Sequence, residues 1–285
     1  MNELEFLSGL RELPLHVGAR NLEDDCAVFE FGNETLIVTH DMMAEGTHFL
    51  PEAKMADVAW KLVTMNLSDL ASKGAKPLGA FLGASLGRDD EGFIHGLRDA
   101  LAVHSLPLMG GDTISSTGAS TFGITALGEA THKPVPARRG SKPGDGIFIT
   151  GIIGCAMLGF EGNKQHADAF NRPQARLSEG IALAPHVSAM MDISDGLLLD
   201  GWRMATASGV SFRLNPELIP VCDAARLDDC LRWGDDYELL FTLPADRESI
   251  VPATRIGKVE AKSDAPIYLG GTAFADPDTL GYRHG

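Results

Sequence analysis

Apolar and polar residues alternate with two different periods along the chain, and each period predicts a type of secondary structure. Between Met55 and Lys73, apolar residues recur every three to four positions, which predicts an amphipathic helix. Gly74 suits the position just after its last turn, and Pro77 prevents the helix from continuing. The same period predicts helices over Glu91–His104 and Leu197–Ser208, and a further helix after Gly154.

Short runs of apolar and β-branched residues predict strands between these helices. Cys26–Phe31 and Thr35–Thr39 flank the Gly32-Asn33 pair, and we expect them to form a hairpin. Further strands are predicted over Leu78–Leu86, Leu106–Met109, Thr121–Ala130, Ile147–Thr150, Ala189–Ile193, Val210–Leu214 and Tyr237–Leu243. Because strands and helices are mixed in both halves, the predicted fold class is α/β, or α+β.

The segment from Thr131 to Gly146 separates two such patterns. Its sequence, THKPVPARRGSKPGDG, is rich in Pro, Gly and Arg, which is typical of a connection between domains. The length of 285 residues also favours two domains, at about 150 residues each. We therefore predict an N-terminal sheet domain over residues 1–137 and a C-terminal α/β domain over residues 138–285.

The chain carries more acidic than basic residues. Lys and Arg number 24 and Asp and Glu number 39, which gives a formal net charge of −15. A nucleic-acid-binding surface needs clustered Lys and Arg, and an anionic membrane repels acidic proteins, so we expect neither partner. Most surplus carboxylates are expected to keep the surface soluble, whereas a subset could hold divalent cations.

The first residues and the cysteines indicate a compartment. The chain begins MNELEFLSGLRELP, with acids where a signal peptide has a basic region. The most apolar stretch, Gly146–Phe160, is too short to span a bilayer. Cys26, Cys155, Cys222 and Cys230 have neither C-x-x-C nor zinc-site spacing. We therefore expect a cytoplasmic protein with reduced cysteines.

Six aspartates stand beside apolar strands, beside glycines or on a predicted helix face: Asp25, Asp41, Asp69, Asp112, Asp192 and Asp195. A carboxylate at the end of an apolar strand is costly to bury unless it is paired, hydrogen-bonded or bound to metal. Each could instead cap a helix or close a turn. As a set without a Cys or His cluster, these oxygens suit Mg²⁺ better than zinc. By contrast, we expect solvated loop acids at Asp24, Asp89, Asp90, Asp228 and Asp229.

The usual phosphate-binding motifs are missing from the sequence. It contains no G-x-x-x-x-G-K-[ST] loop and no G-x-G-x-x-G pattern. The protein-kinase motifs and the G-x-S-x-G nucleophile elbow are also absent. If this chain handles ATP, it must do so through metal bridges and scattered hydrogen-bond donors.

Nine short blocks follow one another along nearly the whole chain. They are DDCAVF (24–29), THDMMAEGTHFLP (39–51), MNLSDLASKGAKPLG (65–79), LMGGDT (108–113), TALGEA (125–130), RRGSKPGDGIFITG (138–151), MDISDGLLLD (191–200), GDDYELLFTLP (234–244) and GYRHG (281–285). Taken together, the blocks resemble the thiamine-monophosphate kinase family, within the superfamily of aminoimidazole ribonucleotide synthetase.

The resemblance implies ATP as co-substrate, several Mg²⁺ ions and a role for each matching residue. The implied metal ligands are Asp25, Thr39, His40, Asp41, Asp69, Asp112, Asp192 and Asp195. The implied nucleotide contacts are Gly111, Asp112, Arg138 and Ser194, and the implied thiamine monophosphate contacts are His48, Asp235 and Tyr282. The N-terminal domain would bind ATP and Mg²⁺ and pair its sheet with that of a second copy in a homodimer, and the C-terminal domain would complete the substrate site.

The implied reaction transfers the γ-phosphoryl group of ATP to the phosphate of thiamine monophosphate, giving thiamine diphosphate. Both substrates are polyanions, and cations held by carboxylates would reduce their repulsion. The acceptor phosphate, with a second pKa of about 6, is mostly deprotonated at neutral pH, so we assign no general base. Direct in-line transfer without a phosphoenzyme is expected.

Three residues depart from the family pattern. His40 stands where Thr or Ser usually precedes the metal-binding Asp, Glu23 replaces a glycine, and Asp235 replaces a Glu. The C-terminal half also looks abbreviated over residues 160–190. One alternative is therefore a non-catalytic sensor of nucleotide or thiamine phosphate. Another is a different ATP-dependent synthetase of the superfamily, although the reactive cysteines of selenophosphate synthetases and hydrogenase-maturation dehydratases are missing.

Overall fold

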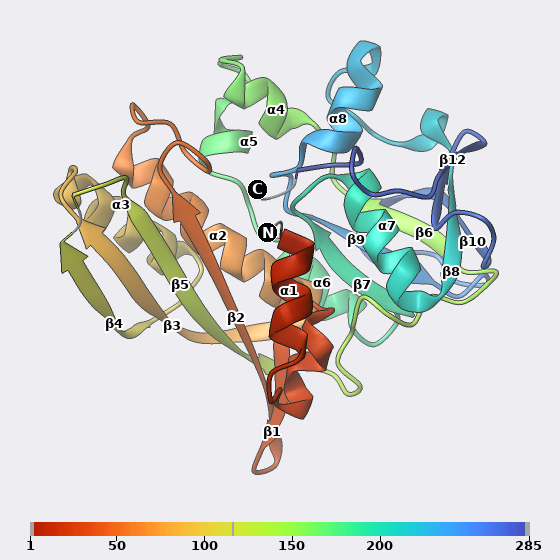
Figure 1. Cartoon of the computed structure of the whole chain (residues 1–285), viewed down its shortest axis with the longest axis horizontal. Coiled ribbons are helices and arrows are strands. Elements are labelled where there is room, and N and C mark those ends of the chain that lie inside the picture. Colours follow the sequence, from red (N-terminus) through yellow and green to blue (C-terminus); the bar gives the residue numbers. More distant parts are fainter. Residues whose placement is uncertain (1–2, 116, 283–285) are drawn as a thin grey trace.

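Each half of the chain builds its own β-sheet, and the halves meet along one long helix (Figure 1). The computed structural model describes residues 3–115 and 117–282. The predicted α/β fold with two domains is confirmed, since each half contains a sheet and helices. The boundary at 137/138 falls in the connection between the two sheets, and its exact position stays a prediction.

The N-terminal sheet has the strand order β1-β2-β5-β3-β4. Only β3 and β4 are parallel neighbours in it, within the part of the chain that the structure describes. Its strands are β1 (Ala27–Phe31), β2 (Glu34–Ala44), β3 (Ala75–Leu86), β4 (Leu108–Ser115) and β5 (Thr121–Ala130). The helical segments of this half are α1 (Glu3–Arg11), the 3₁₀ segment η1 (Val17–Leu22), α2 (Met55–Ser72) and α3 (Asp90–Val103).

The C-terminal sheet has the strand order β12-β11-β8-β10-β6-β9-β7, so β7 lies at one edge. Its strands are β6 (Gly146–Thr150), β7 (Ala189–Ile193), β8 (Val210–Leu214), β9 (Glu238–Leu243), β10 (Ala253–Ala261), β11 (Ile267–Leu269) and β12 (Thr272–Phe274). The helices are α4 (Cys155–Phe160), α5 (Ala167–Asn171), α6 (Leu177–Leu183), α7 (Leu197–Ser208) and α8 (Leu227–Trp233), with short 3₁₀ turns η2 (Pro216–Leu218) and η3 (Ala224–Arg226).

Helix α2 lies between the two domains. Its residues contact β2, β3 and β5 of the N-terminal sheet on one side and α6, β7 and β9 of the C-terminal domain on the other. Leu62, Leu67 and Leu70 of this helix are fully buried, and each contributes about 1.5–3 kcal/mol through the area it removes from water. Polar residues of α2 are buried as well, which is unusual for an amphipathic helix.

Most of the predicted elements are present, but β3 begins three residues earlier than predicted, at Ala75, and two strands continue beyond their predicted C-terminal ends. Strand β2 continues past Thr39 to Ala44 because β5 supplies hydrogen-bonding partners along this stretch. Strand β4 continues through Gly110 and Gly111, whose backbone is extended. Asp41 and Asp112 therefore lie within strands rather than after them. We did not predict α1 or the C-terminal strands β10, β11 and β12.

The prediction that all four cysteines are reduced is wrong for one pair. Cys155 and Cys222 are joined by a disulfide, whereas Cys26 and Cys230 are free and buried. The paired cysteines are 67 positions apart in the chain. A short backbone bridge between Ile153 and Val221 brings them together, and local spacing gives no signal for such a contact.

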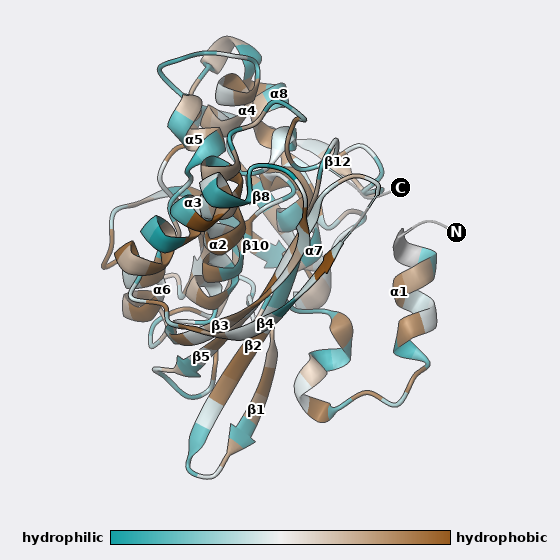
Figure 2. Ribbon diagram, turned by 90° about the vertical axis from the view of Figure 1, so that its left-hand side faces the viewer, coloured by the Kyte–Doolittle hydropathy of each residue, from teal (hydrophilic) through white to brown (hydrophobic). Residues whose placement is uncertain are grey.

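Helix α1 stands apart from the two domains (Figure 2). Its described side chains include Phe6, which is exposed. Among residues 3–115 and 117–282, no helix combines the length and the apolar character needed to cross a bilayer. The most apolar stretch of the sequence, Gly146–Phe160, is divided between β6 and α4.

The contact between α2 and α6 depends on a glycine. A Cβ atom on Gly180 would lie 2.0 Å from the carbonyl oxygen of Ala71, so Gly180→Ala should push α6 away from α2. We expect a loss of about 1–3 kcal/mol in the free energy of unfolding, measured by urea denaturation. Gly9→Ala is the control because nothing lies within 4 Å of its added Cβ. Equal stabilities of Gly180→Ala and wild type would contradict this account of the interface.

Candidate active site

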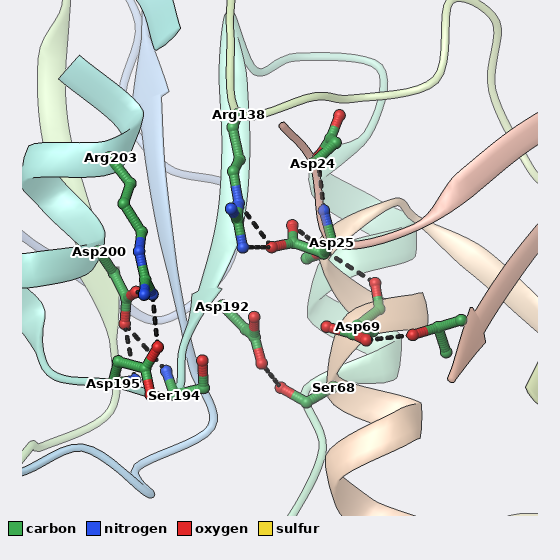
Figure 3. Close-up of polar contacts among 12 residues, drawn as sticks. Asp24, Asp25, Ser68, Asp69, Arg138, Asp192, Ser194, Asp195, Asp200 and Arg203 are labelled. Atoms are coloured by element: carbon green, nitrogen blue, oxygen red, sulfur yellow. Dashed lines mark hydrogen bonds and ion pairs between the residues drawn. The ribbon is translucent and has the colours of Figure 1, made fainter. Parts of the chain in front are cut away.

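Three carboxylates from distant parts of the sequence come together between the domains (Figure 3). Asp25 precedes β1, Asp69 lies on α2, and Asp192 lies near the end of β7. One oxygen from each lies within 4.8 Å of the others. Of the eight predicted metal ligands, these three form the centre of the site.

Hydroxyl groups on neighbouring elements orient these carboxylates. Thr39 of β2 donates its hydroxyl hydrogen to Asp69 Oδ2. Ser68 of α2 donates to Asp192 Oδ2 at 2.6 Å. Thr39 is buried, as alternation along β2 requires for a residue on the face that packs on α2. The polar face of α2 therefore determines where carboxylates of both domains point.

Helix α2 also positions the main chain of Asp41. The side-chain oxygen of Asn66 accepts a hydrogen bond from the Asp41 N–H at 3.1 Å. Asp41 lies two residues after Thr39 on β2, so the two side chains are on the same face of the strand. Burial is the largest cause of the raised pKa of Asp69, and the charge of Asp41 is the next largest. Asp41 thus acts on the same cluster.

Two cations neutralise Asp25. Lys73 is fully buried directly after α2, where its Nζ pairs with Asp25 and lies 2.6 Å from Asp24 Oδ1. Arg138 Nε donates to Asp25 Oδ1 at 2.7 Å. Burial alone would raise the pKa of Asp25, but Arg138 and Lys73 outweigh it and hold that pKa well below its ordinary value. Asp24 was predicted to be solvated, which is wrong: Lys73 and Arg20 pair with it, and its side chain is 5% exposed.

Asp69 and Asp192 are affected in the opposite direction. Burial, with the charge of Asp25 adding to it, raises the pKa of Asp192 to about 8. Burial and the neighbouring carboxylates also raise the pKa of Asp69 well above its ordinary value. A buried carboxylate with a raised pKa has too little positive charge around it, and a divalent cation would supply that charge. The donors are oxygens, so the residues present fit Mg²⁺.

The loop after β7 presents a further acidic group. Arg203 of α7 pairs with Asp195 at 2.5 Å and with Asp200 at 2.9 Å. Asp200 Oδ2 accepts hydrogen bonds from the N–H groups of Ser194 and Asp195 at 3.1 and 3.0 Å. Asp200 therefore fixes the loop that carries the predicted residues Ser194 and Asp195. Sequence reasoning missed Asp200 and Arg203, although their three-residue spacing on a predicted helix was a usable signal.

A second loop, residues 234–237, packs directly on the first. A Cβ on Gly234 would lie 2.3 Å from the Ser194 carbonyl oxygen, and the Asp235 N–H donates to that oxygen at 2.8 Å. Asp235 has a left-handed backbone with φ of 58°, which is uncommon for residues other than glycine and is found often at functional sites. Lys61 of α2 pairs with its carboxylate at 2.7 Å, and the Tyr237 hydroxyl donates to it at 2.8 Å. Lys61 was not predicted.

The other two predicted substrate contacts lie on loops. His48 follows β2, and its Nδ1 accepts a hydrogen bond from the Ala44 N–H at 3.1 Å. Tyr282 is tied to the loop after β7, because its N–H donates to the Asp195 carbonyl oxygen at 3.0 Å. Its side chain is 41% exposed. The last three residues of the GYRHG block, 283–285, lie outside the described residues.

Three predicted residues are not brought to the carboxylate cluster. The His40 side chain is exposed on the opposite face of β2 from Thr39, with a ring nitrogen 2.8 Å from the hydroxyl of Thr125 on β5. Gly111 and Asp112 are exposed on the edge strand β4. Since β5 and β3 separate β4 from β2, the two strands are about 14 Å apart at about 4.8 Å per strand.

Known proteins share both the sequence and the fold of this chain. The family model "AIR synthase related protein, N-terminal domain" matches residues 23–130. A thiamine-monophosphate kinase of Caulobacter vibrioides is 34% identical, over 94% of this chain and 86% of the relative. The Escherichia coli K12 thiamine-monophosphate kinase is 33% identical, over 92% of this chain and 90% of the relative.

Solved structures of related proteins have the same fold as this chain. AaThiL complexed with AMPPCP and TMP has a TM-score of 0.87 at 25% identity, covering 100% of this chain and 97% of that one. The hydrogenase maturation protein HypE in complex with ATP has a TM-score of 0.71 at 17% identity, covering 95% of this chain and 92% of that one, and it shares the fold. On sequence identity over nearly its whole length, this chain belongs to the thiamine-monophosphate kinase family.

Proposed function

We propose that this protein phosphorylates thiamine monophosphate to thiamine diphosphate with ATP. The observation that carries the proposal is the cluster of Asp25, Asp69 and Asp192, whose oxygens lie within 4.8 Å of one another between the domains. A cation-binding site of this kind lets an acidic protein hold two phosphate-bearing substrates. The choice of substrates is supported by relatives named for this kinase and by AaThiL, which was solved with AMPPCP and TMP.

We infer that Mg²⁺ is held by Asp25, Asp69 and Asp192, and that Thr39, Asp41 and Asp195 complete the ligand set. When bound, Mg²⁺ would neutralise charge on the phosphate oxygens. The chain itself keeps the ligands in place: Thr39 orients Asp69 and Ser68 orients Asp192. His40 would contribute through its backbone carbonyl, since its ring lies on the other face of β2.

The remaining predicted residues divide between the two substrates. Arg138 and Ser194 would contact the nucleotide, and Arg138 is also one of the two cations that lower the pKa of Asp25. His48, Asp235 and Tyr282 would contact thiamine monophosphate, with Lys61 and Tyr237 fixing the shorter Asp235 side chain. Because the acceptor phosphate is already ionised at neutral pH, direct in-line transfer needs no general base. A cytoplasmic location fits these soluble substrates.

We further infer a homodimer that pairs the N-terminal sheets. Met42 and Phe81 are 54% and 40% exposed on the outer face of the sheet. Strand β4 is an exposed edge over all eight of its residues, without the lysines or prolines that usually protect one. A second copy would cover this surface, and with it Gly111 and Asp112, the predicted nucleotide contacts that lie far from β2.

The activity itself is tested with purified protein, ATP and Mg²⁺. Thiamine monophosphate should yield thiamine diphosphate, whereas thiamine and aminoimidazole precursors offered as competing acceptors should not react. Product formation is measured by chromatography, and nucleotide binding by calorimetry. Bound nucleotide without any product would favour the sensor alternative, and turnover of another acceptor would favour a different synthetase of the superfamily.

Asp69→Asn should reduce kcat by at least about 100-fold, because a buried cation ligand is lost. Metal-free Asp69→Asn protein should be more stable than metal-free wild type, since a buried carboxylate with a raised pKa destabilises the fold increasingly as pH rises above about 4. Thermal unfolding at pH 5 and pH 8 measures this, and the difference should be larger at pH 8. A near-normal kcat in Asp69→Asn would show that Asp69 is not a ligand of the catalytic cation.

Phe81→Asp should convert the dimer into a monomer by placing a charge in the pairing surface. Light scattering at micromolar concentration measures the mass. Ile250→Asp is a matched control, because Ile250 is 59% exposed but lies in the C-terminal domain. A monomeric wild type, or a dimer that persists in Phe81→Asp, would contradict the sheet pairing.

A further inference from the structure

Two cysteines and a histidine from three separate segments come together in the C-terminal domain, outside the carboxylate site. Cys155 begins α4, His166 directly precedes α5, and Cys222 lies between η2 and η3. Their sulfur and nitrogen atoms all lie within 4.8 Å of one another, with Cys222 Sγ 3.9 Å from His166 Nδ1. All three side chains are half-buried, so an ion can reach them from solvent.

The backbone holds the two cysteines close together. The Ile153 N–H donates to the Pro220 carbonyl oxygen at 3.1 Å, and the Cys222 N–H donates to the Ile153 carbonyl oxygen at 3.0 Å. The Cα atoms of Cys155 and Cys222 are 5.3 Å apart as a result. Main-chain hydrogen bonds between these two segments therefore prearrange the two sulfur ligands.

Two glycines allow the close packing of the backbone around this cluster. A Cβ on Gly159 would lie 2.3 Å from the carbonyl oxygen of His166, so α4 can pack against this residue only with glycine there. Gly154, just before Cys155, has a φ of +80°, and a Cβ on it would lie 2.4 Å from Cys230 Sγ. The turn that leads into Cys155 therefore needs glycine on both conformational and steric grounds.

We propose that this cluster, when reduced, binds one Zn²⁺ ion through the Cys155 and Cys222 thiolates and His166 Nδ1. Two thiolates and an imidazole are a ligand set that zinc prefers over hard cations. With Zn–S of about 2.3 Å and Zn–N of about 2.0 Å, tetrahedral geometry puts sulfur and nitrogen about 3.5 Å apart. The Cys222–His166 separation of 3.9 Å is close to that value. A water molecule would take the fourth position.

The disulfide between Cys155 and Cys222 is the oxidised form of the same site. A dithiol reductant opens it: two electrons and two protons pass to the cysteines, and the reductant becomes a disulfide. Zinc binding then releases both thiol protons to solvent, and the metal takes their place on the sulfurs. Disulfide and zinc are mutually exclusive, because bonded sulfurs offer no thiolate.

The ion would join α4, α5 and the segment after η2, which form one wall beside the predicted acceptor residues. Helices α4 and α5 pack together (Figure 1). The Nζ atom of Lys61 lies over the ring of Phe170 on α5, 4.0 Å from the ring centroid, in a cation–π contact. Lys61 in turn forms an ion pair with Asp235. Zinc at this cluster is therefore expected to stabilise the segment that supports Asp235.

Co²⁺ is the spectroscopic probe, because thiolate-to-cobalt charge transfer reports sulfur ligation and ignores carboxylate sites. Full-length protein is reduced with a phosphine, stripped of metal and titrated with Co²⁺ in excess Mg²⁺. We expect one Co²⁺ per chain with a thiolate charge-transfer band in the near ultraviolet, and displacement of that band by Zn²⁺. The same protein oxidised to the disulfide should show no band. Absence of the band from reduced wild type would overturn the proposal.

Variants identify the ligands. Cys222→Ser should abolish the band, and His166→Ala should weaken Co²⁺ binding at least tenfold, since even outer partners of metal ligands contribute about 10–100-fold. Cys230→Ser is the matched control, because Cys230 is a neighbouring buried thiol outside the cluster. An unchanged band in Cys222→Ser, or unchanged affinity in His166→Ala, would contradict the three-ligand site. With Mg²⁺ in excess at the carboxylate site, Zn²⁺ should also raise the thermal midpoint of reduced wild type and leave that of Cys222→Ser unchanged.

Discussion

The burial of negative charge between the two domains is the constraint on which the rest of the structure depends. Asp25, Asp69 and Asp192 would repel one another across less than 4.8 Å if all were ionised without cations. Lys73 and Arg138 stabilise Asp25 as a carboxylate, whereas burial leaves Asp69 and Asp192 with raised pKa values. Without a bound cation, burial favours the protonated forms of Asp69 and Asp192, and a divalent cation would take the place of those protons.

Helix α2 makes this arrangement possible because it is buried on both sides. One face packs on the N-terminal sheet, and the other meets α6, β7 and β9. Its polar residues are therefore buried with it, and some of them make contacts between the domains. Ser68 donates to Asp192 on β7, and Lys61 pairs with Asp235 in a loop, so a hydrogen bond and an ion pair link α2 to the C-terminal domain. The same contacts that hold the domains together also build the site.

The formal net charge of −15 overstates the negative charge that is exposed to solvent, because some of the acids are buried in ion pairs. An acidic chain is a poor match for phosphates by simple charge, but several of its acids are withdrawn from solvent into pairs with Arg and Lys. Asp195 and Asp200, for example, share Arg203, and Asp24 shares Lys73 with Asp25. The negative charge at the site therefore comes from a few carboxylates held in fixed positions. Such carboxylates are suited to bind the cations that accompany phosphate-bearing substrates.

Much of the site could be predicted from the sequence, because the family blocks and the strand pattern place acids beside apolar segments. Asp25, Asp69 and Asp192 meet as a metal site requires. The residues that support them were harder to find. Lys61 and Lys73 look like ordinary surface cations in the sequence, and only burial distinguishes them. Arg203 is half-buried, and its one local signal is the acid three positions before it on the same helix. Their partners lie in other elements of the chain or, for Arg203, partly in a neighbouring loop.

The sequence by itself determined the order of elements and the chemistry of the acids, since periodicity and residue type are local properties. Tertiary structure decided which side chains meet. It put His40 on the outer face of β2 and Asp112 on the sheet edge, because strand alternation and strand order are settled by pairing with β5 and β3. It also joined Cys155 to Cys222, 67 positions away, through a backbone bridge. Contacts between residues far apart in the chain have no local signal, and they arise only when burial of the apolar core brings distant segments together.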